Sequence, residues 1–163
     1  MTKTRHQRWT IGAMYTGLGL TAAATALPYA DRATSHLLAD HIRAGYPTYT
    51  PAEVDSAVTT YLVLLSAIGV LGVIGWLWTT WAVKAGKSWA RPATTAMSLL
   101  SASVGLTGLL TMDTSGETGL PPALGWAGMA PTLAALLAVT LLWRRPRDSG
   151  RASEPTLPSI RAR

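Results

Sequence analysis

The residues that could form a catalytic or metal site gather in three polar segments, at residues 31–45, 53–55 and 113–122. In the first, between Asp31 and Gly45, His36 and Asp40 are four residues apart and would share one face of a helix. A histidine and a carboxylate at this spacing are ligands that a divalent metal accepts. Four further acids could complete the site if the loops fold over one another: Glu53, Asp55, Asp113 and Glu117. The alternative is ordinary polar surface, which the lack of a recognised metal motif favours.

The rest of the chain lacks the residues that most catalytic chemistry needs. It contains no cysteine, which excludes disulfides, thiolate metal sites and iron–sulfur clusters. Four long segments contain no Asp, Glu, Lys, Arg or His. Proton-coupled transporters normally place a titratable group at membrane depth, so these segments argue against that class. We therefore expect no cofactor and no enzymatic activity.

The four uncharged segments are the elements that must position any site. They cover residues 10–29, 56–83, 92–112 and 123–143, and about 20 apolar residues are enough to cross a bilayer. Only 13% of the residues are charged. The sequence thus predicts an all-α, four-helix transmembrane bundle over residues 1–147, followed by a disordered cytoplasmic tail at 148–163. A signal peptide is the alternative for the first segment, although its apolar run is longer than usual.

The second segment is longer than a bilayer requires. Thr50-Pro51-Ala52-Glu53 is typical of a helix start, with Thr50 as N-cap and Glu53 closing a capping box. A helix from there to Val83 would reach about 50 Å, against a hydrocarbon core of about 30 Å. Its start should stand outside the membrane. Before it, the amphipathic stretch that ends at Gly45 predicts a short extracytoplasmic helix and loop cap between spans 1 and 2.

The positive charges predict the orientation. Twelve Lys and Arg residues lie before the first span, between spans two and three, and in the tail, whereas only Arg32 and Arg43 lie on the other side. This bias places both termini in the cytoplasm, in a multi-pass protein of the plasma membrane of a bacterium. The net charge of +6 then reflects topology. We expect no nucleic-acid partner.

Small residues mark where the spans approach one another. Gly69, Gly72 and Gly75 recur every three residues, and Pro131 should bend the fourth span. Helices in lipid associate through such close contacts, so packing is the first interpretation and a ligand groove the second. The leading functional hypothesis is a non-enzymatic protein that binds a membrane protein, a second copy of itself or lipid. One alternative is a passive binder or conduit for a small apolar or zwitterionic molecule, which would use a cavity beside Pro131 and the flank formed by Gly69, Gly72 and Gly75. Another is an extracytoplasmic metal-dependent enzyme that uses His36 and Asp40.

Five stretches also carry a family resemblance: Thr50–Asp55, Gly75–Trp78, Asp113–Pro122, Gly125–Trp126 and Leu142–Arg145. With these stretches the chain resembles uncharacterised small four-span integral membrane proteins of actinobacteria. The resemblance covers about residues 5–147 and implies membrane location and topology. It implies no catalytic residues.

Overall fold

The computed structural model describes residues 5–144 and contains five helices in that range. They are α1 (Arg5–Ala33), α2 (Leu37–Gly45), α3 (Pro51–Lys84), α4 (Ala90–Leu110) and α5 (Pro122–Trp143). Between residues 5 and 144 the only β contact is an isolated bridge that joins Met112 to Thr118. The predicted all-α class is confirmed. The tail predicted at 148–163 lies outside the described residues.

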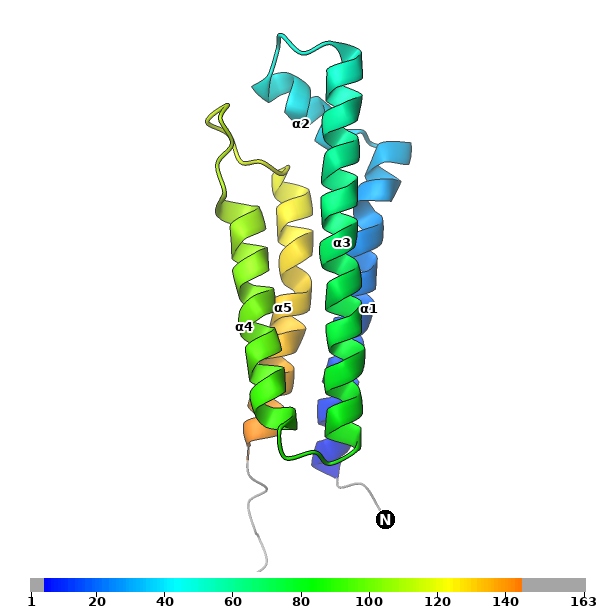
Figure 1. Ribbon diagram of the computed structural model, residues 1–163, viewed down its shortest axis with the longest axis vertical. Coiled ribbons are helices and arrows are strands. Elements are labelled where there is room, and N and C mark those ends of the chain that lie inside the picture. The colour runs from blue at the N-terminus through cyan, green and yellow to red at the C-terminus, as the bar shows by residue number, and fades with distance from the viewer. Residues whose placement is uncertain (1–4, 145–163) are drawn as a thin grey trace, which may run out of the picture.

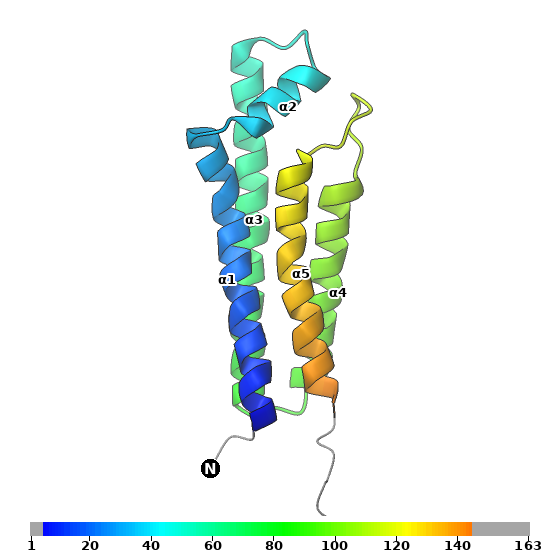
Figure 2. The same ribbon diagram turned by 180° about the vertical axis from the view of Figure 1, so that it is seen from behind.

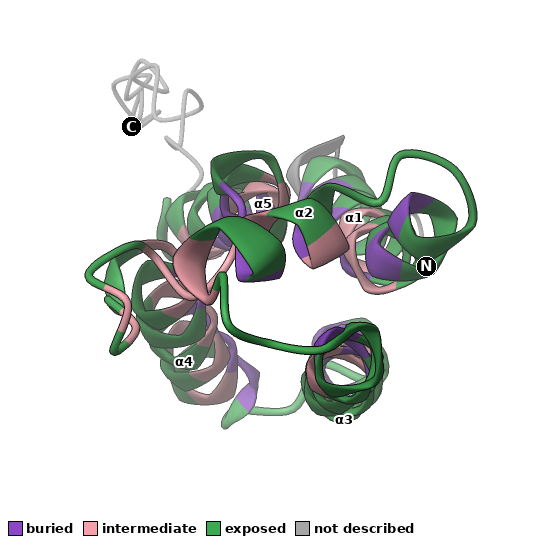
Figure 3. Cartoon of the chain, turned by 90° about the horizontal axis from the view of Figure 1, so that it is seen from above, coloured by how far each residue is buried: buried purple, intermediate pink, exposed green. Residues whose placement is uncertain are grey.

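Four long helices run side by side, and α2 crosses the end of the bundle that lies opposite the N-terminus (Figures 1 and 2). We call this the outer end and the opposite one the inner end. The helix α1 packs along both α3 and α5, and α4 packs along α5. The contact between α3 and α4 is smaller. Seen from above, α3 and α4 stand apart on one side of the bundle, and α5 and α1 lie on the other side (Figure 3).

Three of these helices, α3, α4 and α5, are long and apolar enough to cross a membrane. The helix α1 is not among these three. It is less apolar, because it contains more Gly, Ala and Thr than Leu, Ile and Val. The four-span arrangement therefore stays a prediction. The helix α1 also runs through Pro28 to Ala33, four residues past the predicted span.

The start of α3 follows the sequence prediction. The Thr50 side chain accepts a hydrogen bond from the Glu53 N–H, and the Glu53 carboxylate accepts one of 2.7 Å from the Thr50 N–H. Pro51 occupies the first helical turn, where its missing N–H costs nothing. The capping box at this position is confirmed, and it fixes where the overhanging end of α3 begins.

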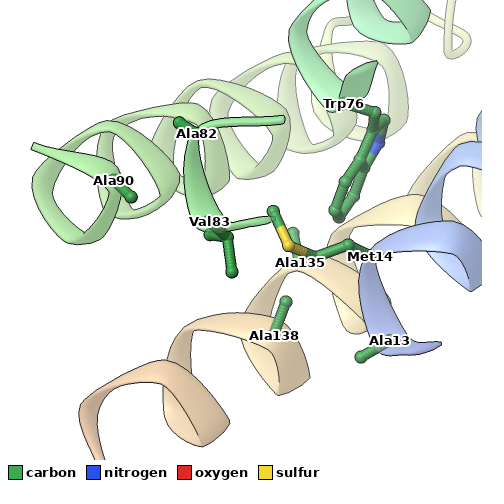
Figure 4. Close-up of a cluster of buried hydrophobic side chains, with 8 residues drawn as sticks. All are labelled: Ala13, Met14, Trp76, Ala82, Val83, Ala90, Ala135 and Ala138. Carbon is green, nitrogen blue, oxygen red and sulfur yellow. The ribbon is translucent and has the colours of Figure 1, made fainter. Parts of the chain in front are cut away.

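The buried apolar side chains form two separate clusters. The inner cluster joins α1, α3, α4 and α5, with Met14 at its centre beside Trp76, Val83 and Ala135 (Figure 4). The outer cluster joins α2 to the overhanging end of α3 and consists of Leu38, Ile42, Val54, Val58 and Leu62. Because Leu38 and Ile42 are four residues apart, one face of α2 is covered by α3.

Candidate functional site

Asp31 fixes the position of α2 at the outer end. One carboxylate oxygen accepts hydrogen bonds from the Leu37 N–H at 2.8 Å and the Ser35 hydroxyl at 2.7 Å, and the other from the Leu38 N–H at 3.0 Å. Burial raises the pKa of Asp31, but these hydrogen bonds and nearby His36 outweigh it and hold the pKa below the ordinary 3.8. Sequence reasoning missed this role, because a cap six residues before a helix matches no standard capping spacing.

The predicted metal pair does not share a helix face. The chain leaves α1 after Ala33, and His36 lies before α2 in a left-handed conformation with a φ of 54°. The expectation of a helix that carries both residues is therefore wrong, because the break separates His36 from α2. Asp40 lies on α2 and pairs with Arg43 at 2.7 Å. Within the described residues no group of three or more His, Cys, Asp and Glu side chains could hold a metal ion.

The loop between α4 and α5 is tied to the cap. The His41 ring donates a hydrogen bond of 2.5 Å to the Thr118 carbonyl, and the Tyr46 and Thr114 hydroxyls share one of 2.5 Å. A hydrogen bond from Tyr46 also lowers the pKa of Asp113 below its ordinary value. The acidic loop thus lies against α2, which makes the cap one connected unit above the bundle.

A cleft of about 170 Å³ opens between the end of α1, α2 and the start of α3. Its charged lining consists of Asp31, Arg32, Arg43, Asp55 and the titratable His36. One Arg32 nitrogen pairs with an Asp55 oxygen at 2.8 Å, and another donates to the Thr59 hydroxyl at 3.2 Å. The Arg32 and Asp55 side chains are 42% and 67% exposed, so both reach solvent or lipid. The floor is apolar, because Val54 and Val58 are buried there.

The contact between α1 and α3 is made mainly by small and polar residues. The contacting pairs, from the outer to the inner end, are Arg32 with Asp55, Tyr29 with Ser66, Thr25 with Gly69, Thr21 with Gly72, and Gly17 with Trp76. A Cβ added at Gly69 would collide with Thr25, and one at Gly72 would lie 3.0 Å from the Thr21 methyl. These two glycines therefore allow α1 to approach α3 closely.

The other two predicted packing or groove residues lie elsewhere. Gly75 faces Met97 of α4, so the three glycines serve two different helix contacts. Pro131 is buried within α5. Next to it, the Thr132 and Ser101 hydroxyls share a hydrogen bond of 3.1 Å that joins α5 to α4. Whether any of the four residues takes part in ligand binding stays a prediction.

Beyond Gly75, the α4-facing side of α3 loses its partner. Leu71, Ile68 and Leu64 follow Gly75 outward at helical spacing, and all three side chains are exposed. On α4, Val104 lies seven residues beyond Met97 on the same side and is also exposed. The two helices diverge toward their outer ends (Figure 1). We call these four residues the α3–α4 face.

The cap, the cleft and the α3–α4 face are thus three features of residues 5–144 that a ligand or partner can contact. The resemblance to actinobacterial four-span membrane proteins stays a prediction. No protein-family model, curated protein or solved structure matches this chain.

Proposed function

We propose that the chain is a four-span, non-enzymatic protein of a bacterial plasma membrane that binds another membrane component. The observation that carries the proposal is how little of the apolar helices is covered. In their most apolar windows, only 17% of α3, 17% of α4 and 33% of α5 is buried. Apolar surface on this scale needs lipid or another protein against it.

Aromatic side chains support α1 as the fourth span. Exposed Trp9 and Tyr29 lie twenty residues apart on α1, about the 30 Å thickness of a hydrocarbon core. No charged residue lies between them. At the inner end, Trp9 is joined by a set of exposed indoles that are typical of a membrane interface: Trp78, Trp81, Trp89 and Trp143.

The positive charges support an orientation with both termini in the cytoplasm. Lys84 and Lys87 lie at the same end as the indoles, and each sits over an aromatic ring. Interfacial lysines with aromatic partners are typical of the cytoplasmic side of a membrane. The cap then lies outside the cytoplasm, on the opposite surface.

The α3–α4 face is the proposed binding surface for a helix of a partner protein or of a second copy. Three features favour it: it is apolar, its two helices diverge, and the small Gly75 lies at its inner end. A helix that seats there would contact both α3 and α4. In this arrangement the protein acts by association and not by catalysis.

A photocrosslinking amino acid at Ile68 tests this proposal. Leu99 serves as the control position, because it is equally apolar and exposed but lies about 200° around α4 from Met97, which contacts Gly75 of α3. Irradiation in membranes should give a discrete protein adduct or dimer from position 68 and only lipid adducts from position 99. Equal yields of protein adduct from the two positions, or lipid adducts alone from both, would contradict the proposed surface.

A further inference from the structure

The cleft between α1, α2 and α3 lies at the depth of lipid head groups, given the four-span arrangement proposed above. On α3, twenty residues separate Trp81 at the inner interface from Tyr61, which is about the 30 Å of the hydrocarbon core. Val58 and Asp55 line the cleft three and six residues farther out, or about 5 and 9 Å. Head groups occupy about the first 5–8 Å beyond the hydrocarbon core.

The cleft presents both signs of charge to a ligand. Two guanidinium groups, of Arg32 and Arg43, line it together with two carboxylates, of Asp31 and Asp55. Asp31 is committed to α2 through three hydrogen bonds. Asp55 is the carboxylate with exposed surface, and Arg43 is 56% exposed. A ligand with one negative and one positive group matches this lining better than an anion.

The size of the cleft suits a head group. Its 170 Å³ equals the volume of roughly five to six water molecules of about 30 Å³ each. That is room for a phosphate and a short amine, whereas an acyl chain must lie outside. Below the cleft, Tyr29 of α1 lies at the boundary of the hydrocarbon core, and the stripe Val63 and Val70 of α3 is exposed apolar surface at hydrocarbon depth.

We propose that this cleft binds a phospholipid with a phosphate and a primary ammonium in its head group. The phosphate pairs with Arg43 and Arg32, because guanidinium groups bind phosphate oxygens through parallel N–H donors. The ammonium pairs with Asp55, and one acyl chain lies along Tyr29, Val63 and Val70. The apolar floor of Val54 and Val58 excludes water from beneath the head group.

Native mass spectrometry of the full chain tests this site. The detergent-purified protein is titrated with three phospholipids of identical acyl chains, whose head groups are phosphoethanolamine, phosphocholine and phosphoglycerol. We expect a single molecule of the phosphoethanolamine lipid to bind per protein, at least about tenfold more tightly than the other two lipids. Phosphocholine lacks the N–H groups that donate to Asp55, and phosphoglycerol lacks the positive charge. Free phosphoethanolamine should bind more weakly than the lipid, because it has no chain.

Two variants locate the binding. Arg43→Gln should weaken phosphoethanolamine-lipid binding about tenfold, the typical loss of one charged hydrogen bond. Asp55→Asn should remove the preference over phosphocholine. Arg91→Gln, at the opposite end of the bundle, is the control and should change neither. Melting curves of all variants show whether the fold is kept, and Arg43→Gln alters only an exposed ion pair.

Equal binding of the three lipids, or tighter binding of the phosphoglycerol lipid, would overturn the proposal. So would unchanged binding in a folded Arg43→Gln variant. Either result, together with a discrete protein adduct from Ile68, would remove the lipid site alone and leave the proposed binding function standing. Absence of a protein adduct from Ile68, with the lipid selectivity intact, would remove the proposed α3–α4 binding surface and leave the lipid site standing.

Discussion

Replacing Gly17 by alanine should destabilise the bundle through one side chain. The Trp76 indole lies against Gly17, so an added Cβ would lie 2.8 Å from ring atom Cε2 and nearer still to two other ring carbons. Ordinary contact needs 3.4 Å, so the ring must move by about 0.6 Å or more. It is not free to move, because Trp76 Nε1 donates a hydrogen bond of 3.0 Å to the Thr21 hydroxyl.

The energy terms have opposite signs and do not cancel. Overpacking costs about 1–3 kcal/mol, and loss of the indole hydrogen bond adds about 0.6 kcal/mol in a membrane protein. The higher helix propensity of alanine returns at most about 1 kcal/mol. The net loss of about 0.6–2.6 kcal/mol corresponds to a melting temperature lower by roughly 1–10 °C.

Thermal melting in one detergent at one heating rate measures this loss. Gly19→Ala is the matched control on the same helix, because no heavy atom lies within 4 Å of its added Cβ. It should melt at or above the temperature of the parent. In a Trp76→Leu background, Gly17→Ala should cost far less, since the two sites are coupled. Equal melting of the two alanine variants, or an unchanged loss without Trp76, would refute the close contact.

Three further predictions concern the cap. Leu38→Ala removes a side chain that is 1% exposed and should cost about 2–5 kcal/mol, releasing α2 to limited proteolysis while the bundle stays folded. The cap of the parent should lose stability as the pH falls below 3.8, because the pKa of Asp31 is lower in the folded protein. Asp31→Asn should be less stable at neutral pH and show a smaller acid loss, measured by melting against pH. Zinc should leave the melting temperature of the parent unchanged; stoichiometric zinc that is lost in His36→Ala would contradict the non-enzymatic proposal.

The helices were predictable from the sequence because their signals are local. Long uncharged runs indicate spans, and the Thr50 box depends on residues three apart. The break at residues 34–36 was missed for the opposite reason. Its cause is the Asp31 carboxylate, which bonds N–H groups six and seven residues away. Nothing in the helical periodicity of that stretch distinguishes a broken helix from a continuous one.

The candidate site was less predictable because it depends on tertiary contacts. The spacing of Gly69, Gly72 and Gly75 indicates close approach, but not that two of them face α1 and one faces α4. The cleft needs Arg32 and Asp55 to meet across a separation of 23 residues. The only sequence signal for the cleft was that Arg32 and Arg43 are the only Lys or Arg residues on the predicted outer side.

Labelling of single cysteines tests the central claim of a four-span protein most directly. The chain has no cysteine, so each introduced thiol is the only one present. Cysteines at Thr34, Ser88 and Ser115, and one in a tag before Met1, are treated in intact cells with a membrane-impermeant maleimide. We expect labelling of positions 34 and 115 in intact cells, and labelling of position 88 and of the tag only after lysis. Labelling of the tag in intact cells would show that α1 does not cross the membrane, and labelling of all four positions would contradict membrane insertion altogether.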